Sequence, residues 1–367
     1  MGSSQGANSL VGCPSRHIDD FFTRNALDYQ TRNQCLRFAQ LIFPGELVGE
    51  ADTQGECSYT VAVSTTHLLQ FRPGRFSLDM EIYKDARHIF KHLVSETTYL
   101  GPFSGIPAPR IPHINPPLLH VYLMNKVPGV RLSGIPQIHG NPHREFRHNL
   151  VRDMAAIFAK SYHHGVPSRR RHTLPAGKGI QGRIGSSLRW RANLLTSIAD
   201  AKISQEAQAT KYHLGHIERL PWCLTHGDLI PSNIMVDPQT GHITGLLDWA
   251  EGEWLPLGVG MYAIDECLGQ DDAEKGFVYF DDHAELRALF WRTFLGLCEG
   301  HTPARNDVLK LSEVEMARRL GLLLWHGIAF DDGRLDRLVE AGRDDGELNK
   351  LRVLLDAPSL LESISTL

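Results

Sequence analysis

The stretch that decides the fold is Thr225–Asp237, which reads THGDLIPSNIMVD, followed by Ile243–Trp249, which reads ITGLLDW. Three polar residues in the first part follow the pattern H-x-D-x-x-x-x-N: His226, Asp228 and Asn233. Short apolar runs lie on both sides of Pro238–Gly241, whose residues favour a turn. The pattern therefore predicts a β-hairpin that begins directly after the polar residues.

The spacing of polar residues around this hairpin predicts a phosphate-handling site. If the hairpin is symmetric about Thr240–Gly241, Asn233 and Asp248 lie directly opposite each other. Their amide and carboxylate oxygens are hard ligands that suit Mg²⁺ beside phosphate oxygens. Asp228 precedes them in a loop, where it would accept a proton from an attacking hydroxyl, and His226 is expected to hold that loop through backbone hydrogen bonds. The alternative is that these residues only cap a turn and begin or end strands.

Composition excludes several classes of protein. The chain has 367 residues, with 42% hydrophobic and 22% charged residues, which is typical of a folded globular chain of more than one ordinary domain. Its formal net charge of −4 argues against nucleic-acid binding. No stretch approaches the roughly 20 apolar residues that cross a bilayer. We therefore expect neither nucleic acid nor a membrane as a partner.

The cysteines and the first residues indicate the compartment. Six cysteines lie far apart, without a C-x-x-C pair or metal-ligand spacing. Scattered thiols are typical of reduced, mostly buried residues in an intracellular protein, so we expect a cytoplasmic location. Residues 1–15 are rich in Gly and Ser and lack the apolar core of a secretory signal. They are predicted to form a flexible tail.

Residues 16–127 have the pattern of a small, β-rich lobe. A helical pattern occupies Asp19–Phe43, and Met80–Val94 has the periodicity of an amphipathic helix. Leu118–Met124 is an almost wholly apolar strand. Three further runs predict an antiparallel meander: Glu46–Glu50, Ser58–Ser64 and His67–Arg72.

Residues 128–367 have the pattern of a larger, mainly helical lobe. Helical patterns occupy Phe146–His163, Ile180–Ala201 and nearly all of the chain from Ala284 onward. The change of character occurs at a short Pro-Gly break after residue 127. A β-rich lobe followed by an α-rich lobe predicts an α+β, two-lobed molecule whose ligands bind in a cleft between the lobes.

The pattern from His226 to Asn233, with Leu247–Trp249 downstream, resembles the aminoglycoside phosphotransferase and choline kinase-like family, small-molecule relatives of the protein kinases. Two later segments, Ala250–Gly258 and Leu324–Gly333, resemble the uncharacterised fungal branch of that family. The resemblance implies a protein kinase-like fold with a small antiparallel N-terminal lobe and a larger helical C-terminal lobe. It also implies Mg²⁺-requiring transfer of the γ-phosphate of ATP or GTP to a hydroxyl of a small molecule.

The resemblance also implies roles for individual residues. Asp228 would be the catalytic base in the loop that begins at His226, and Asn233 and Asp248 would be Mg²⁺ ligands. The backbone of Leu123–Val127 would be the hinge that binds the nucleobase. On the nucleotide side the candidates are Ser58, Arg72, Glu81, Met124, Asn125 and Val127.

The N-terminal lobe departs from the family pattern. Kinase-like sites place a lysine on the third strand, paired with a helix glutamate, but the chain has no lysine before Lys84. Arg72 is the only cation in the corresponding place, and Glu81 and Asp85 are alternative partners for it. The phosphate loop Gln54–Ser58 holds one glycine and an acidic residue, a poor cradle for phosphate. These departures favour the alternative function, a kinase-fold protein without phosphotransfer: a pseudokinase, a ligand-binding module or an enzyme repurposed for other chemistry.

Acidic residues after the hairpin are candidates for binding a cationic acceptor, as they do in many relatives. The alternative is that they cap a helix or form ion pairs. The candidate acceptor residues are Glu251, Glu253, Asp265 and Glu266.

Overall fold

The computed structural model describes residues 14–106, 117–135, 138, 140–168, 184–299, 310–331 and 334–359. The chain divides into two units. The sheet unit is drawn from Ala7–Tyr83 and Ser95–Val127, and the helical unit from Lys84–Val94 and Pro128–Leu367. The predicted tail lies outside the described residues except for Pro14 and Ser15, which begin helix α1.

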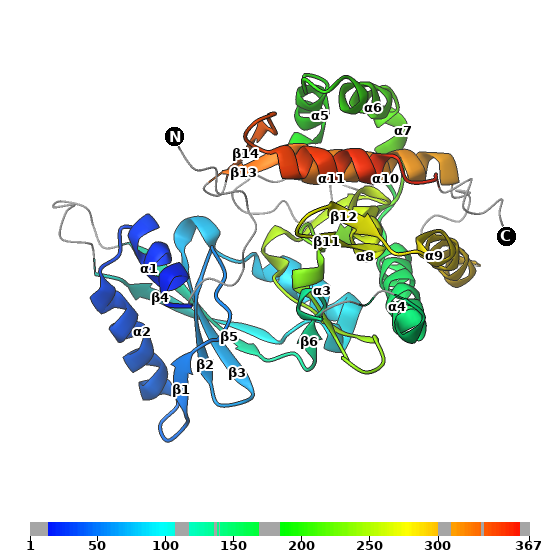
Figure 1. The fold of residues 1–367 in the computed structure, drawn as a ribbon. Helices are drawn as coiled ribbons and strands as arrows, with labels where there is room; N and C mark the ends of the chain where they lie inside the picture. Colours follow the sequence, from blue (N-terminus) through cyan, green and yellow to red (C-terminus); the bar gives the residue numbers. More distant parts are fainter. Residues whose placement is uncertain are drawn as a thin grey trace. The chain divides into compact units, whose positions relative to one another are not determined.

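A five-stranded antiparallel sheet forms the centre of the sheet unit, in the order β1-β2-β3-β5-β4 (Figure 1). Its strands are β1 (Val48–Glu50), β2 (Tyr59–Val63), β3 (His67–Pro73), β4 (Thr97–Ser104) and β5 (Leu118–Asn125). The predicted meander and the predicted apolar strand are confirmed by β1, β2, β3 and β5. Strand β4 was not predicted, because it lies at the sheet edge with mostly exposed side chains and contains a glycine and a proline.

Helices α1 (Pro14–Arg24) and α2 (Tyr29–Ile42) pack on one face of this sheet (Figure 1). The single helical pattern predicted there divides because Asp28 begins the second helix, its side chain accepting a hydrogen bond from the N–H of Gln30. The buried side chains between helices and sheet include Phe21, Phe22, Cys35, Ala39, Tyr59, Val61, Leu69, Phe71, Leu119 and Val121.

Helix α3 (Met80–Phe90) and the 3-10 turn η2 (Lys91–Leu93) follow the strand β3 and the turn η1 (Gly74–Phe76). The amphipathic periodicity predicted for this segment is confirmed. The apolar side chains that recur along one side of this segment are all buried: Ile82, Ala86, Ile89, Phe90 and Leu93.

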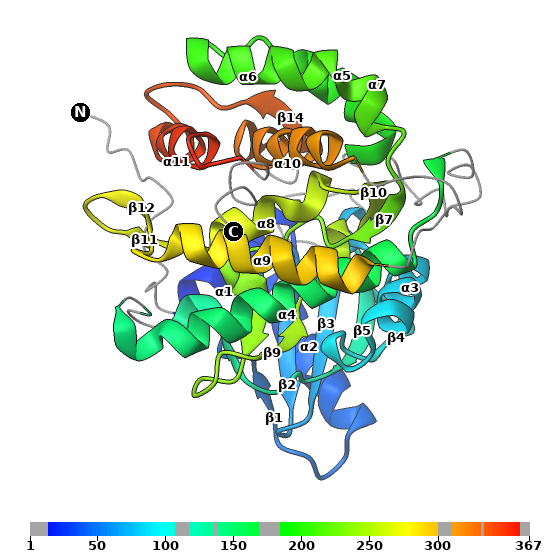
Figure 2. The same cartoon turned by 90° about the vertical axis from the view of Figure 1, so that its right-hand side faces the viewer.

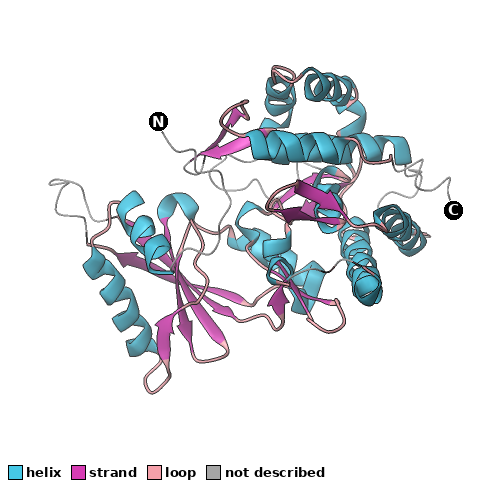
Figure 3. Cartoon of the chain, in the orientation of Figure 1, coloured by secondary structure: helices cyan, strands magenta, loops and turns pink. Residues whose placement is uncertain are grey.

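Helices dominate the helical unit (Figure 3). They are α4 (Arg144–His163), α5 (Ile184–Leu195), α6 (Ala201–Tyr212), α7 (Leu214–Ile217), α8 (Tyr262–Cys267), α9 (His283–Cys298), α10 (Leu311–His326) and α11 (Asp345–Leu355). Helices α4 and α9 lie side by side (Figure 2). None of the helices in the described ranges combines the length and apolarity needed to span a membrane.

Four small sheets lie among these helices. The first contains β6 (Val130–Arg131), β8 (Ile234–Val236) and β9 (Ile243–Leu246) in the order β6-β8-β9. The others pair β7 (Trp222–Thr225) with β10 (Glu253–Pro256), β11 (Gly269–Asp272) with β12 (Gly276–Tyr279), and β13 (Ile328–Asp331) with β14 (Arg334–Leu338). The helical unit also contains short 3-10 turns: η3 (Leu132–Gly134), η4 (Asn141–His143), η6 (Pro231–Asn233), η7 (Trp249–Glu251) and η8 (Val259–Met261).

The prediction of nearly continuous helix from Ala284 onward is wrong for one stretch. Helix α10 ends at His326 with Gly327 as its C-cap, and the chain then forms the β13–β14 hairpin before α11. A hairpin of two such short strands leaves little periodicity in the sequence. The predicted α+β class is confirmed by the antiparallel sheet and the separate set of helices.

Candidate active site

A tight turn after β7 begins the loop that carries the polar pattern. Residues 226–233, here called the Asp228 loop, connect β7 to β8. Gly227 has a φ of +82°, and a Cβ atom there would lie 2.1 Å from the carbonyl oxygen of Glu251. Only glycine tolerates both that φ and that approach. The loop therefore passes directly over η7, which follows the hairpin.

His226 holds the Asp228 loop against the end of the hairpin. Its Nε2–H donates to the carbonyl oxygen of Leu247 at 2.7 Å, and its Nδ1 accepts from the N–H of Asp228 at 3.3 Å. Its ring contacts that of Trp249, with 4.6 Å between the ring centroids. Burial lowers the pKa of His226 to about 4, against smaller opposing effects of Leu247 and Asp248. The imidazole is therefore neutral at pH 7, with both nitrogens bonded to backbone as expected.

Asp228 and Asn233 form one hydrogen-bonded unit. The Nδ2 of Asn233 donates to Oδ2 of Asp228 at 2.8 Å and to its backbone oxygen at 2.9 Å. The other carboxylate oxygen, Oδ1, is buried and has no hydrogen-bond partner in the described part of the chain. Burial, followed by the charges of Glu251 and Asp248, raises the pKa of Asp228 to about 8. The ionised form of this carboxyl group, which predominates only above about pH 8, is thus a strong proton acceptor with one oxygen available.

The two acceptors on Asp228 also fix the orientation of the Asn233 amide. Because both are oxygens, the NH₂ end of the amide must face them. The carbonyl oxygen Oδ1 of Asn233 is consequently directed away from Asp228. This leaves it available as a ligand.

The hairpin register differs by one residue from the symmetric hairpin predicted above. The turn is centred one residue earlier than predicted, since the N–H of Asp237 donates to the carbonyl oxygen of His242. A β-bulge between Met235 and Val236 then changes the register, so that the strands beyond it are offset by less. The N–H of Leu247 donates to the carbonyl oxygen of Asn233 at 2.8 Å. The prediction that Asn233 and Asp248 are direct cross-strand partners is therefore wrong, because Asn233 faces Leu247.

Asp248 nevertheless lies beside the Asp228 loop. Its backbone is left-handed, with φ 56° and ψ 75°, a conformation that is costly for a residue other than glycine. The carboxylate is exposed. Its negative charge raises the pKa of Asp228 and favours the protonated forms of His226 and Arg131. The left-handed turn thus places the Asp248 carboxylate close to Asp228, although Asp248 is not the cross-strand partner of Asn233.

Asn233 and Asp248 fit a magnesium ion that also binds phosphate. They offer an amide oxygen and a carboxylate, the hard donors that Mg²⁺ prefers. Among the described residues, no three His, Cys, Asp or Glu side chains are grouped to hold a metal ion. A two-ligand shell of this kind is typical of Mg²⁺ that shares its coordination with phosphate oxygens and water. The residues do not fit a metal site built from protein alone.

The first two acidic candidates differ in position. Glu251 lies in η7, is half-buried, and its charge raises the pKa of Asp228. Glu253 is buried, and its Oε1 accepts a hydrogen bond from the N–H of Ile184 at 2.8 Å, at the first residue of α5. Glu251 therefore lies near the proposed base, whereas Glu253 anchors the start of a helix.

Asp265 and Glu266 both lie in buried ion pairs. Asp265 is fully buried between Arg287, 2.6 Å away, and Arg318. Glu266 contacts Nε2 of His326 at 2.8 Å and Nζ of Lys350 at 2.9 Å. These two cations hold the pKa of Glu266 at about 2 in spite of its burial. The positions explain how α8 is fixed to α9, α10 and α11, and they do not suit direct contact with an acceptor.

The nucleotide-side candidates in the sheet unit are placed as follows. Arg72 on β3 is buried, and its guanidinium donates to the carbonyl oxygen of Phe76 at 2.8 Å and to Oε1 of Gln70 at 3.1 Å. Glu81 is exposed on α3, and Ser58 is buried directly before β2. The alternative partner Asp85 belongs to the helical unit, where its carboxylate accepts from Nε1 of Trp254 at 3.3 Å.

The expected hinge is partly occupied by the protein's own hydrogen bonds. Met124 is the penultimate residue of β5 and pairs with β3 and with β4. The N–H groups of Asn125 and Lys126 donate to the carbonyl oxygens of Glu96 and Thr66. A nucleobase at this segment would therefore need carbonyl groups of these residues or the N–H of Val127.

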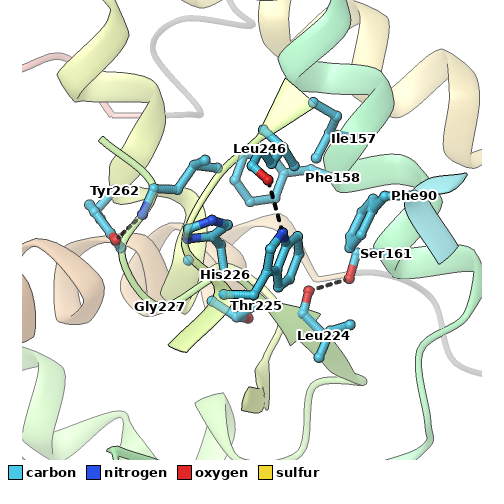
Figure 4. Close-up of a pocket in the computed structure, with 13 residues that line it drawn as sticks. Phe90, Ile157, Phe158, Ser161, Leu224, Thr225, His226, Gly227, Leu246 and Tyr262 are labelled. Atoms are coloured by element: carbon cyan, nitrogen blue, oxygen red, sulfur yellow. Dashed lines mark hydrogen bonds between the residues drawn. The ribbon is translucent and has the colours of Figure 1, made fainter. Parts of the chain in front are cut away.

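A cavity of about 20 Å³ lies behind the Asp228 loop (Figure 4). Aromatic side chains line it, including Phe90, Trp249 and Tyr262. The hydroxyl of Tyr262 accepts from the N–H of Leu229 at 2.9 Å and so ties the loop to α8. The volume suits about one water molecule, so this cavity is not an acceptor pocket.

Arg131 is a charged residue near the site that was not predicted from the sequence. It lies on β6, within range of the charge of Asp248. The only sequence signal was a single arginine two residues after the Pro-Gly break.

Comparison with known proteins places this site in a family. The model of the phosphotransferase enzyme family matches residues 61–258, more than half of the chain and all of the Asp228 loop. No curated protein matches the chain.

Solved structures give the fold. The GDP complex of wild-type aminoglycoside 2'-phosphotransferase-IIIa is similar over 93% of this chain and 100% of that chain, with 14% identity and a TM-score of 0.51. A GDP and kanamycin complex of APH(2")-IIia covers 89% and 97%, with 14% identity and a TM-score of 0.49. ADP-bound APH(2'')-Ib covers 90% and 97%, with 11% identity and a TM-score of 0.45. The first of these supports the expected kinase-like fold, and the match of the family model shows that the chain belongs to the phosphotransferase enzyme family.

Proposed function

We propose that this protein is a magnesium-requiring phosphotransferase that moves the γ-phosphate of ATP or GTP to a hydroxyl group of a small molecule. The observation that carries the proposal is the carboxylate of Asp228. Asn233 holds one of its oxygens at 2.8 Å, and the other is buried without a partner among the described residues. A proton acceptor with one fixed and one available oxygen is what an attacking hydroxyl requires.

Asp228 would act as the general base. An acceptor hydroxyl would donate its hydrogen bond to Oδ1 of Asp228, and its proton would pass to that oxygen as its bond to the γ-phosphorus forms. The bond between the γ-phosphorus and the β–γ bridging oxygen would break in the same step, and the nucleoside diphosphate would leave with that oxygen. His226 and Asn233 would not exchange protons. Their hydrogen bonds keep the carboxylate at a constant angle, which supports in-line attack.

Asn233 and Asp248 would hold Mg²⁺ through the amide oxygen Oδ1 and the carboxylate. A magnesium ion there supplies charge neutralisation for the phosphate oxygens. The protein's own contribution is orientation. The Asn233 amide is aligned by its two bonds to Asp228, and the backbone of Asp248 is held in a left-handed turn.

The sheet unit would bind the rest of the nucleotide. We propose the hinge, Leu123–Val127, for the base, with Met124, Asn125 and Val127 as its binding residues. We propose Ser58, Arg72 and Glu81 for the phosphate side. The GDP complex of the similar aminoglycoside 2'-phosphotransferase-IIIa supports a nucleotide in this fold. Because the contacts described for the Arg72 guanidinium are to Phe76 and Gln70, a role in phosphate binding would require it to share or exchange them.

We propose a small hydroxyl-bearing molecule as the acceptor, with Glu251 as the acidic residue that faces it. Glu251 is the one acidic candidate that is half-buried beside Asp228 and outside the described ion pairs of α8. We also propose a cytoplasmic location. The buried thiols of Cys35, Cys223, Cys267 and Cys298 suit a reducing compartment.

Titration calorimetry with ATP and with GTP, each with and without Mg²⁺, tests the proposal. We expect binding that depends on Mg²⁺ and is weakened at least tenfold in Asp248→Ala. Glu145→Ala is the matched control, because it removes one exposed carboxylate from α4 and should bind as the wild type does. Absence of binding at saturating nucleotide would contradict the proposal and favour the alternative of a kinase-fold protein without phosphotransfer.

A further inference from the structure

Strand β6 places one arginine beside the proposed phosphate site from within the helical unit. Arg131 is paired with Met235 of β8, two residues after Asn233 (β6 is labelled in Figure 1). Directly opposite residues of an antiparallel pair project on the same face of the sheet. Ile234 and Val236 are buried on the other face. Arg131 therefore shares the less buried face of this small sheet, and β6 also packs against η6, which ends at Asn233.

A close contact fixes β6 in this position. Gly129 has a φ of +104°, and a Cβ atom there would lie 2.5 Å from both Oγ1 of Thr244 and the carbonyl oxygen of Val236. Thr244 donates from Oγ1 to the carbonyl oxygen of Pro128 at 2.6 Å. The segment that enters β6 is thus held against the β8–β9 hairpin, so Arg131 keeps a constant place relative to Asp248.

The guanidinium of Arg131 differs from those of the buried arginines. Arg147 donates to Asp282, Ile138 and Gly140, and Arg318 pairs with Asp265 and Glu315. Arg131 is half-buried, but within the described ranges its guanidinium enters no hydrogen bond or ion pair of the structure. Burial lowers its pKa by more than the charge of Asp248 raises it. A partly desolvated cation with so little compensating charge is stabilised by an anion.

We propose that Arg131 binds the phosphate groups of the donor nucleotide from within the helical unit. This inference rests on the proposed function, because it assigns a ligand at the same site. The planar fork of a guanidinium donates two parallel hydrogen bonds to phosphate oxygens. An anion that also binds through Mg²⁺ at Asp248 would be attracted to both charges.

Binding of three probes to the wild type and to Arg131→Met tests the inference: Mg-ADP, adenosine and inorganic tripolyphosphate with Mg²⁺. We expect the variant to bind Mg-ADP and tripolyphosphate about 10- to 100-fold more weakly, the loss that corresponds to one charged hydrogen-bonding partner. Affinity for adenosine should not change. Arg131→Lys should recover part of the phosphate affinity, because it keeps the charge and loses the fork.

Arg152→Met is the matched control, since it removes one partly exposed positive charge from α4 of the same unit and should leave all three affinities unchanged. Equal affinity of wild type and Arg131→Met for Mg-ADP would overturn the inference and leave the proposed function standing. If the wild type binds no nucleotide but binds tripolyphosphate through Arg131, the proposed function fails and the anion site stands. Absence of binding to any phosphate probe overturns both.

Discussion

His226 shows how a residue of the motif serves the site without touching a reacting atom. Both ring nitrogens are bonded to backbone, at Leu247 and at Asp228. The imidazole thereby sets the distance between the loop and the end of the hairpin. The same local pattern made Asp228, Asn233 and Asp248 predictable from sequence, because all three lie within one loop and hairpin.

Replacement of His226 by alanine should lower the free energy of unfolding by about 2–3 kcal/mol at pH 7, since two hydrogen bonds and a buried ring are lost. The pKa of His226 is about 4 in the folded protein and 6.5 in the unfolded chain. The unfolded chain therefore binds a proton first as the pH falls from 6.5 to 4, and the wild type loses stability in that window. Urea unfolding at pH 7 and pH 4.5 should show the difference between the proteins shrinking on acidification. A constant difference would contradict the assignment.

At the scale of elements, the features that could not be predicted from sequence are those that depend on contacts between segments far apart in the chain. Asp265 was a candidate for acceptor binding, but its partners Arg287 and Arg318 lie 22 and 53 residues further along the chain. The hairpin was predictable from its turn residues. Its β-bulge was not, because the number of residues in each strand depends on how the hairpin packs.

The buried ion pairs of Asp265 should be far more important for stability than an exposed pair between neighbouring helices. In Asp265→Asn, the buried guanidinium of Arg287 on α9 loses its described negative partner and that of Arg318 on α10 keeps only Glu315, so the free energy of unfolding should fall by about 3–5 kcal/mol. Glu285→Gln, which breaks the exposed pair with Arg144 on α4, should cost under about 1 kcal/mol. Urea unfolding of both variants measures the contrast. Similar losses in the two would contradict the role given to Asp265.

Across the whole molecule, the α+β class and the principal strands and helices were predictable because apolar periodicity is local. The division of the chain into the sheet unit and the helical unit was less predictable. Residues 84–94 group with the helical unit, through contacts such as the stacking of Phe90 on Trp249, which no local pattern encodes. Helix α11 is also held in the helical unit by charge. His326 on α10 contacts both Glu266 on α8 and Glu347 on α11.

This arrangement predicts a pH dependence of stability at alkaline pH. Burial lowers the pKa of His326, but Glu266 and Glu347, which both contact it, raise the pKa above 6.5. Lys350 contacts Glu266 and Asp271 beside this cluster. The stabilisation by protonated His326 is thus fully present below pH 6.5 and is lost as the pH rises through the raised pKa.

Unfolding free energies at pH 6 and pH 9, measured in the wild type and in His326→Gln, test this dependence. The wild type should lose more stability than the variant between the two values. An equal loss would show that His326 does not titrate in that range.

The most direct test of the central claim is the rate of Mg²⁺-dependent γ-phosphate release from ATP and GTP, with water as the acceptor, in the wild type and in Asp228→Asn. The variant keeps the shape of the side chain but cannot accept the proton. We expect release to fall at least about 100-fold, the usual contribution of a general base, while the calorimetric affinity for Mg-nucleotide stays within about threefold. Equal rates in the two proteins would contradict the assignment of Asp228 as the base, and absence of release from the wild type with either nucleotide would contradict the proposed phosphotransfer itself.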